Sequence, residues 1–192
     1  MKTKIEVINY LISKYKYKSY LEIGVRSPHR NFDQIIIQDK EGVDPNPSSK
    51  CMHIMTSDDF FKQNKKTYDI ILIDGLHLAS QVEKDIINSL NFLSKDGIIV
   101  MHDCNPIKEQ HQLKEIQSGV WNGNVWEAFA KFRMNRTDLS MHVINIDHGT
   151  GIIKKGSQEL FPHIKHLNYK FLEDNRAKLL NLITPDEFKK IY

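Results

Sequence analysis

The chain has 192 residues, of which 40% are apolar and 27% are charged. This composition is typical of a soluble globular protein, and the length suits one large core but not two ordinary domains. The formal net charge is only +3 and the charges are dispersed, which does not favour nucleic acid as a partner. No apolar run approaches the ~20 residues of a membrane span, and two cysteines cannot build a disulfide framework. We therefore expect a cytoplasmic protein with a single domain over residues 1–192.

The first third of the chain predicts a helix followed by short strands. Apolar residues at helical spacing indicate an amphipathic helix within residues 1–18, whose lysines suggest a solvated face. Residues 19–25 (SYLEIGV) have the pattern of a buried strand, whereas residues 32–38 (FDQIIIQ) suit either a strand or a helix. Residues 42–47 (GVDPNP) indicate a strand end broken by prolines, and residues 52–56 (MHIMT) predict another short strand.

The middle third contains the clearest signals. Ser57 precedes two acidic residues and predicts the N-cap of a helix over residues 57–64. Residues 69–74 (DIILID) predict a buried strand. An apolar stripe over residues 82–93 predicts a helix, and residues 97–103 (GIIVMHD) predict a second buried strand.

The last part of the chain predicts a helix, a strand pair and a helical end. Residues 123–133 (GNVWEAFAKFR) have a helical pattern. Residues 141–146 and 150–156 are joined by a short turn, which predicts an antiparallel closing pair of strands. We expect residues 157–192 to be a C-terminal helical segment.

Strands that are apolar throughout and alternate with helices indicate an α/β fold, a doubly wound and mostly parallel sheet covered on both faces. In such sheets ligands bind beyond the carboxyl ends of the strands. The residues at the predicted strand ends are therefore the first candidates for a functional site: Gly24, Asp44, Asp74 and Asp103.

The first two strand ends suggest a nucleotide-like cofactor. Gly24 either lets the backbone approach a cofactor or simply ends its strand. Asp44, 20 residues later, suits the two hydroxyls of a ribose or else a turn. Asp58 either compensates a helix dipole or accepts a hydrogen bond from an adenine amino group. Arg26 and Arg30 stand where a G-x-G-x-x-G fingerprint would have further glycines, which disfavours pyrophosphate binding as in NAD enzymes.

The other two strand ends suggest chemistry. Asp74 and Asp103 would end neighbouring strands, which lie ~4.8 Å apart. Two carboxylates this close need a proton or a cation between them, and Mg²⁺ is a hard cation that prefers oxygen ligands. His102 and Asn105 could supplement the ligands. His77 lies three residues after Asp74 and is either a general base in the same cleft or a surface histidine of the turn.

Five segments in this order carry a resemblance: YLEIGV, GVDPNP, TSDDFF, YDIILIDGLH and LSKDGIIVMHDCNP. Through them, residues 20–156 resemble the class I S-adenosylmethionine-dependent methyltransferases. The resemblance implies a Rossmann-like, seven-stranded sheet that is mostly parallel and has an antiparallel closing strand. The IDGLH segment and the later HD pair are similar to the subgroup of macrocin and mycinamicin O-methyltransferases, which act on sugar hydroxyls.

The resemblance also implies a role for each candidate. His77 would take the hydroxyl proton, with Asp74 as its catalytic neighbour. A divalent metal ion, Mg²⁺ or another, would be held by Asp74 and Asp103, with His102 as a third ligand. The residues that would contact S-adenosylmethionine are Glu22, Gly24, Asp44, Ser57, Asp58 and Asp74.

The chain departs from the subgroup in two respects. His102 stands where an acidic metal ligand is usual, so it would bind a softer ion or replace the metal's charge when protonated. Cys104 occupies the place of an asparagine in catechol-type methyltransferases and suits a packed thiol better than a nucleophile. About 18 residues precede the first predicted strand, too few for the large lid of the macrolide enzymes. We expect residues 106–122, or a partner subunit, to cover the substrate.

The primary hypothesis is methyl transfer from S-adenosylmethionine to a small-molecule or glycan hydroxyl, with a sugar as the preferred acceptor. Three alternatives stay open at this point: a methyltransferase for a non-sugar molecule, a non-catalytic S-adenosylmethionine-binding or scaffold protein, and an NAD-dependent oxidoreductase. We expect neither nucleic-acid nor membrane partners, and a homo-oligomer is compatible with the sequence.

Overall fold

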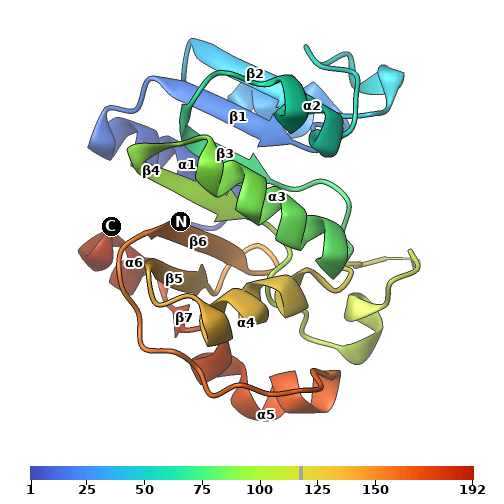
Figure 1. Cartoon of the computed structure of the whole chain (residues 1–192), viewed down its shortest axis with the longest axis vertical. Helices are drawn as coiled ribbons and strands as arrows, with labels where there is room; N and C mark the ends of the chain where they lie inside the picture. The colour runs from blue at the N-terminus through green and yellow to red at the C-terminus, as the bar shows by residue number, and fades with distance from the viewer. Residues whose placement is uncertain (117–118) are drawn as a thin grey trace.

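The protein is built around one seven-stranded sheet with the strand order β2-β1-β3-β4-β6-β5-β7 (Figure 1). The computed structural model describes residues 1–116 and 119–192. The strands are β1 (Ser19–Ile23), β2 (Asp39–Val43), β3 (Tyr68–Ile73), β4 (Leu93–Met101), β5 (Leu139–Ile144), β6 (Thr150–Lys155) and β7 (Leu182–Ile183). β1 to β4 pair in parallel, β6 is antiparallel to both β4 and β5, and β7 is parallel to β5.

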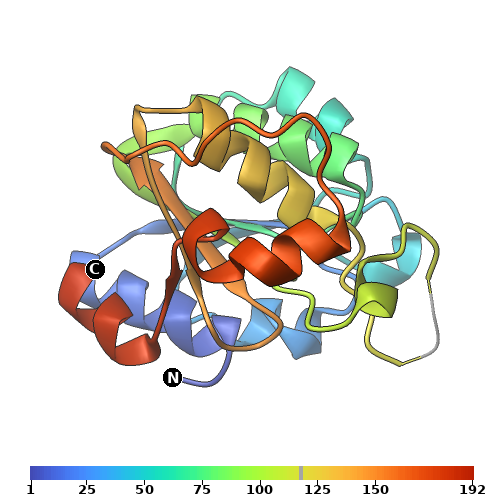
Figure 2. The same ribbon diagram turned by 90° about the horizontal axis from the view of Figure 1, so that it is seen from below.

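Helices cover both faces of this sheet (Figures 1 and 2). One face carries α2 (Ser57–Gln63), α3 (Ala79–Asn91), α4 (Val125–Asn135) and α5 (Tyr169–Leu179). The other face carries α1 (Lys4–Tyr15) and α6 (Pro185–Ile191). Short 3₁₀ turns lie at Pro28–Arg30, Phe32–Gln34, Pro47–Ser49 and Glu109–Gln112. No helix in the described ranges is long and apolar enough to cross a membrane.

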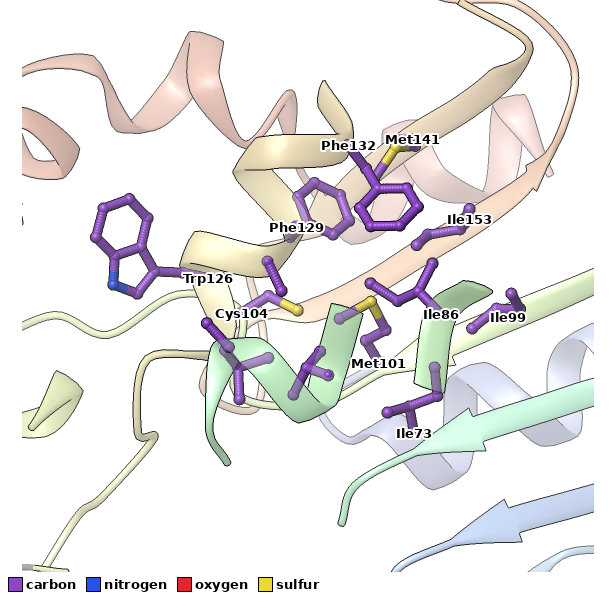
Figure 3. Packing of buried hydrophobic residues seen from close by; sticks show 14 of the residues in the cluster. Ile73, Ile86, Ile99, Met101, Cys104, Trp126, Phe129, Phe132, Met141 and Ile153 are labelled. Carbon is purple, nitrogen blue, oxygen red and sulfur yellow. The ribbon is translucent and has the colours of Figure 1, made fainter. Parts of the chain in front are cut away.

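The core is divided by the sheet because neighbouring strand residues point to opposite faces. On β3, Ile71 and Ile73 belong to the cluster beneath α3 and α4, whereas Ile70 and Leu72 belong to the cluster beneath α1 and α6. Figure 3 shows the first cluster, in which Ile73 and its neighbours from β4 and β6 meet side chains from α3 and α4. Strands that are apolar on both faces leave only their ends for polar chemistry.

The predicted α/β fold is confirmed, but one strand differs from the expectation. Residues 52–56 contribute only an isolated bridge between His53 and Val43. Met52 and Ile54 are 67% and 42% exposed, so no burial holds this segment as a strand. The seventh strand is instead β7, which comes from the C-terminal segment that was expected to be helical throughout.

Two element boundaries and one segment also differ from what the sequence pattern predicts. α3 ends at Asn91, and Leu93, which continues the helical spacing, begins β4 by pairing with Tyr68. The N-cap of α2 is Thr56, whose side chain accepts a hydrogen bond from the Asp59 amide, and Ser57 is the first helical residue. Residues 32–38 form a 3₁₀ turn and irregular chain, neither strand nor α-helix.

Candidate active site

Three adjacent strands end at one cavity. Ile23 of β1 pairs with Ile73 of β3, which pairs with Met101 of β4, so the residues that follow them meet at the same edge of the sheet. The cavity there has a volume of about 940 Å³, at the upper end of the range for small-molecule sites, about 300–1,000 Å³. It is the place where parallel sheets bind their ligands.

Gly24 lies in the floor of this cavity and has no room for a side chain. Its φ is +92°, and a Cβ atom there would lie 2.3 Å from the backbone oxygen of Asp74. The glycine therefore lets β1 and β3 end in direct contact and leaves the backbone open to a ligand.

Asp44 also lines the cavity, and both of its carboxylate oxygens already accept backbone hydrogen bonds. The Arg26 amide donates to Oδ2 at 2.7 Å and the Asn46 amide donates to Oδ1 at 2.8 Å. The turn reading of this residue is therefore correct. Because each carboxylate oxygen has two lone pairs, the same side chain keeps the capacity to accept from a ribose.

The start of α2 and the first turns of α3 form the next wall. Ser57 Oγ donates to Asp85 at 2.6 Å, and Gln81 donates to Asp58 at 2.9 Å. The hydrogen bond from Gln81 and the nearby Lys84 lower the pKa of Asp58. Burial, by contrast, raises the pKa of Asp85 to about 6. Asp85 was not predicted as a site residue because it lies within a helix rather than at a strand end.

Glu22 does not line the cavity among the described residues. Its side chain is fully buried on the α1 face of β1, where Tyr20 donates a 2.6 Å hydrogen bond to it. Burial is the main reason that the pKa of Glu22 is raised to about 8. The expected contact between Glu22 and a cofactor thus has no support from this geometry.

Five charged residues form what we call the strand-end cluster: Lys4, Asp74, His102, Asp103 and Asp147. His102 Nδ1 lies 3.4 Å from Asp74 and 3.0 Å from Asp103, and its Nε2 lies 3.4 Å from Asp147. Asp103 adopts a left-handed φ of +61°, which aspartate tolerates better than most residues, and accepts a 2.7 Å hydrogen bond from Asn122. The predicted meeting of Asp74, His102 and Asp103 is what the structure shows.

Two members of the cluster were not anticipated. Asp147 lies in the turn between β5 and β6, far along the chain from the other carboxylates. Lys4, the first residue of α1, was expected on a solvated face but is only 9% exposed. Its ammonium lies 3.0 Å from Asp74 Oδ2, and its backbone amide donates to Asp147 at 2.9 Å. That amide is one of the unpaired donors at a helix start, so Asp147 both caps α1 and completes the cluster.

The opposite charges shift the pKa values inside the cluster despite burial. The hydrogen bonds to the imidazoles of His102 and His77, together with the charge of Lys4, outweigh burial and hold the pKa of Asp74 well below its usual range. The three surrounding carboxylates likewise raise the pKa of His102 well above its usual value against the opposing effect of burial. The same carboxylates therefore favour the protonated form of His102.

His77 stands in the cavity wall beside the same carboxylates. Its Nε2 lies 3.6 Å from Asp74 and 3.5 Å from Asp103, and its Nδ1 is buried and has no hydrogen-bond partner among the described residues. The ring stacks on Trp121, with centroids 4.8 Å apart and planes at 19°. Trp126 of α4, by contrast, is fully buried and belongs to the first hydrophobic cluster (Figure 3).

The segment after Trp121 locks the turn that carries His77. Gly123 has a φ of +58°, and a Cβ atom there would lie 2.1 Å from the backbone oxygen of His77. The Asn124 amide donates to this oxygen at 3.1 Å, and the Asn124 side chain accepts from Ala79 at 2.8 Å. The position of His77 is therefore set by a segment more than forty residues away.

The donors for a metal ion are close together but already engaged. One oxygen each of Asp74 and Asp103 and one nitrogen of His102 lie within 4.8 Å of one another. Mg²⁺ prefers oxygen ligands, so an imidazole suits it poorly. In addition, His102 must lose its proton to bind any metal, and Lys4 already neutralises Asp74. These residues do not fit a Mg²⁺ site.

Comparison with known proteins relates part of the chain to a known family. Residues 21–104 match a family model described as a methyltransferase domain. The match covers less than half of the 192 residues. The match covers β1 to β4 and with them Gly24, Asp44, Asp74 and Asp103. It agrees with the predicted class of enzyme, a methyltransferase. A search of curated proteins found no match.

Solved structures share the fold of this chain at low identity. A putative caffeoyl-CoA O-methyltransferase from Staphylococcus aureus is 20% identical, with a TM-score of 0.57 and coverage of 79% of this chain and 82% of its own. The methyltransferase PaMTH1 from Podospora anserina, solved with S-adenosylhomocysteine, is 14% identical, with a TM-score of 0.60 and coverage of 82% and 80%. The O-methyltransferase TomG from Streptomyces achromogenes, solved with S-adenosylmethionine, is 9% identical, with a TM-score of 0.59 and coverage of 80% of each chain. Such identities establish the fold alone.

Proposed function

We propose that the protein transfers the methyl group of S-adenosylmethionine to a hydroxyl of a small molecule, with His77 as the general base. The observation that carries the proposal is the position of His77, in the wall of a large strand-end cavity and between two carboxylates. A general base needs such neighbours because they stabilise the imidazolium that forms when it takes a proton.

The reaction is a displacement at the sulfonium methyl carbon. The acceptor O–H bond breaks and its proton passes to His77, while the oxygen forms a bond to the methyl carbon. The bond between that carbon and sulfur breaks, which leaves neutral S-adenosylhomocysteine. Asp74 and Asp103 stabilise the charged His77, and Trp121 holds its ring in place. Orientation and proton removal supply most of the acceleration.

The cofactor would lie along the opposite wall of the cavity. Gly24 allows the backbone to approach it, Asp44 would accept from the ribose hydroxyls, and Asp58 would accept from the adenine amino group. Ser57 lines the same wall and stays part of the predicted contact set. Glu22 is left out of this proposal because its carboxyl is turned away from the cavity onto Tyr20.

The acceptor would enter beside Trp121, where residues 119–121 line the cavity. Ile116, Val120 and Leu76 line it there and are more than two-fifths exposed. Residues 117–118 of the predicted cover lie outside the described residues. The apolar lining favours an acceptor with an apolar part next to its hydroxyl. The sugar or glycan acceptor rests on the macrocin and mycinamicin resemblance and stays a prediction. Metal assistance, expected from the same resemblance, is left out of this mechanism because the donor residues do not fit Mg²⁺.

Binding and turnover test the proposal separately. Isothermal titration calorimetry should detect S-adenosylmethionine and S-adenosylhomocysteine, whereas NAD should neither bind nor raise the melting temperature. A panel of hydroxylated acceptors, with sugars, phenols and aliphatic alcohols as its arms, should then release S-adenosylhomocysteine. Cofactor binding without product from any arm would favour the non-catalytic alternative, and NAD binding would favour the oxidoreductase.

A further inference from the structure

Lys4 is placed unlike any other lysine with a described ion pair in this protein. The side chains of Lys62, Lys66, Lys84, Lys131 and Lys170, which form the other lysine ion pairs of the described residues, are 35% to 74% exposed. The Lys4 side chain is 11% exposed, its partner Asp74 is 12% exposed, and the lysine lines the cavity. Burying an ammonium group costs several kcal/mol unless close partners compensate, so an ordinary surface contact does not explain it.

The backbone explains how the lysine reaches the site. α1 packs on the face of the sheet that it shares with α6, but its first residue, Lys4, lies at the edge where β1, β3 and β4 end. The amide of Lys4 is held by Asp147 Oδ2, and the ammonium of the same residue contacts Asp74 Oδ2. Two carboxylates from different loops thus fix both ends of one residue, which leaves the ammonium little freedom to leave the cavity.

We propose that the ammonium of Lys4, held against Asp74 in the cavity wall, is the resident cation of this active site and supplies the positive charge next to the acceptor oxygen that a divalent metal ion would otherwise supply. The inference rests on the proposed function. In that reaction negative charge develops on the acceptor oxygen as its proton passes to His77. A fixed ammonium at the cavity wall stabilises that charge, and fixed donors of this kind are commonly worth about 10²–10³-fold in turnover.

Lys4 also excludes a metal ion from the cluster. Asp74 Oδ2 faces the ammonium, and Asp74 Oδ1 and Asp103 Oδ2 face His102. Removing the lysine's charge would leave Asp74 and Asp103 beside the imidazoles of His77 and His102, a mixed oxygen and nitrogen donor set that suits Mn²⁺ better than Mg²⁺. The lysine and the metal ion are therefore alternatives, which makes cation binding a direct readout.

The experiment titrates Mn²⁺ into the full-length protein and follows binding by electron paramagnetic resonance and calorimetry. We expect no stoichiometric Mn²⁺ site in the wild-type protein, one site in Lys4→Met, and loss of that site again when Asp103→Asn is added. Lys4→Arg keeps the positive charge and should show no stoichiometric Mn²⁺ binding. Lys14→Met, an exposed change on the same helix, is the matched control and should behave like the wild type.

Each outcome decides the proposal. A stoichiometric Mn²⁺ site in the wild-type protein that Asp103→Asn abolishes would overturn it, and this arm holds even if Lys4→Met does not fold. A folded Lys4→Met without a new site would also overturn it. With an active acceptor, chelators should leave wild-type turnover unchanged, and Lys4→Met should lose about 10²-fold. Calorimetry with S-adenosylmethionine on the same samples distinguishes a failure of the proposed function from a failure of the role of Lys4.

Discussion

The two walls of the cavity are built in opposite ways. On the wall of Asp44 and Asp58, each carboxylate accepts hydrogen bonds from backbone amides or from Gln81; Asp44 is buried, whereas Asp58 is partly exposed. In the strand-end cluster, charged side chains from α1, from the ends of β3 and β4 and from the β5–β6 turn neutralise one another. A single substitution on the wall of Asp44 and Asp58 should therefore affect few other residues. In the strand-end cluster, each charged residue depends on its partners, as buried ion pairs do.

The largest expected effect concerns catalysis in the second wall. His77→Ala should lower turnover by about 10²–10⁴-fold, the usual contribution of a general base, and should change S-adenosylmethionine affinity little. Release of S-adenosylhomocysteine and calorimetry measure the two quantities. His166→Ala, on an exposed segment, is the control. Wild-type turnover in His77→Ala would remove the base from the proposed mechanism.

The second largest effect is expected on the free energy of unfolding, which should fall more for a change in the strand-end cluster than for a change on the wall of Asp44 and Asp58. Asp74→Asn leaves the buried Lys4 without its carboxylate, and breaking a buried pair in this way costs about 3–5 kcal/mol of unfolding free energy. Asp58→Asn loses an exposed contact with Lys84 and should cost at most ~1 kcal/mol. Urea denaturation at neutral pH compares the two variants. Equal losses would contradict the contrast drawn between the walls.

The next prediction concerns the pH dependence of the unfolding free energy that the buried carboxyl of Glu22 causes. The pKa of Glu22 rises from 4.5 to about 8 on folding, so its stabilising contribution is complete below about pH 4.5 and is lost as pH rises to 8. Glu22→Gln mimics the neutral acid and should raise the unfolding free energy at pH 7 by on the order of 2–3 kcal/mol, with no gain near pH 4. Glu6→Gln, on an exposed helix position, should show no such trend.

The smallest effect is expected on the first wall. Asp44→Ala should weaken S-adenosylmethionine binding by about 1–3 kcal/mol, the penalty for leaving ribose hydroxyls unpaired. Calorimetry measures the affinity, and Asp33→Ala at an exposed position is the control. Unchanged affinity in Asp44→Ala would show that this residue serves only the turn after β2.

Sequence patterns predicted the parts of the site that depend on local periodicity. Asp74 and Asp103 could be placed because each follows an apolar run that can only be a buried strand. Leu93 was assigned to a helix because its spacing continues that of α3, while its pairing with Tyr68 is a long-range contact. Such contacts leave no mark on a local pattern, which explains why tertiary structure overrides it.

The unpredicted site residues have the same cause. Lys4 belongs to a lysine-rich helix, and nothing in the spacing distinguishes it from its exposed neighbours. Asp147 looks like an ordinary turn aspartate, and Asp85 like a polar helix position. What makes each of them special is a partner elsewhere in the chain: Asp74 and Asp147 for Lys4, His102 for Asp147, and Ser57 for Asp85.

The bond between the Lys4 amide and Asp147 joins positions 143 residues apart in sequence. During synthesis, all four parallel strands and the methyltransferase-domain segment over residues 21–104 leave the ribosome before residue 147 exists. A nascent chain can therefore assemble the cofactor wall early, but its buried lysine has no complete set of counter-charges until the closing hairpin arrives. The complete strand-end cluster therefore draws on residues from both ends of the polypeptide, and it can form only after the β5–β6 turn has been synthesised.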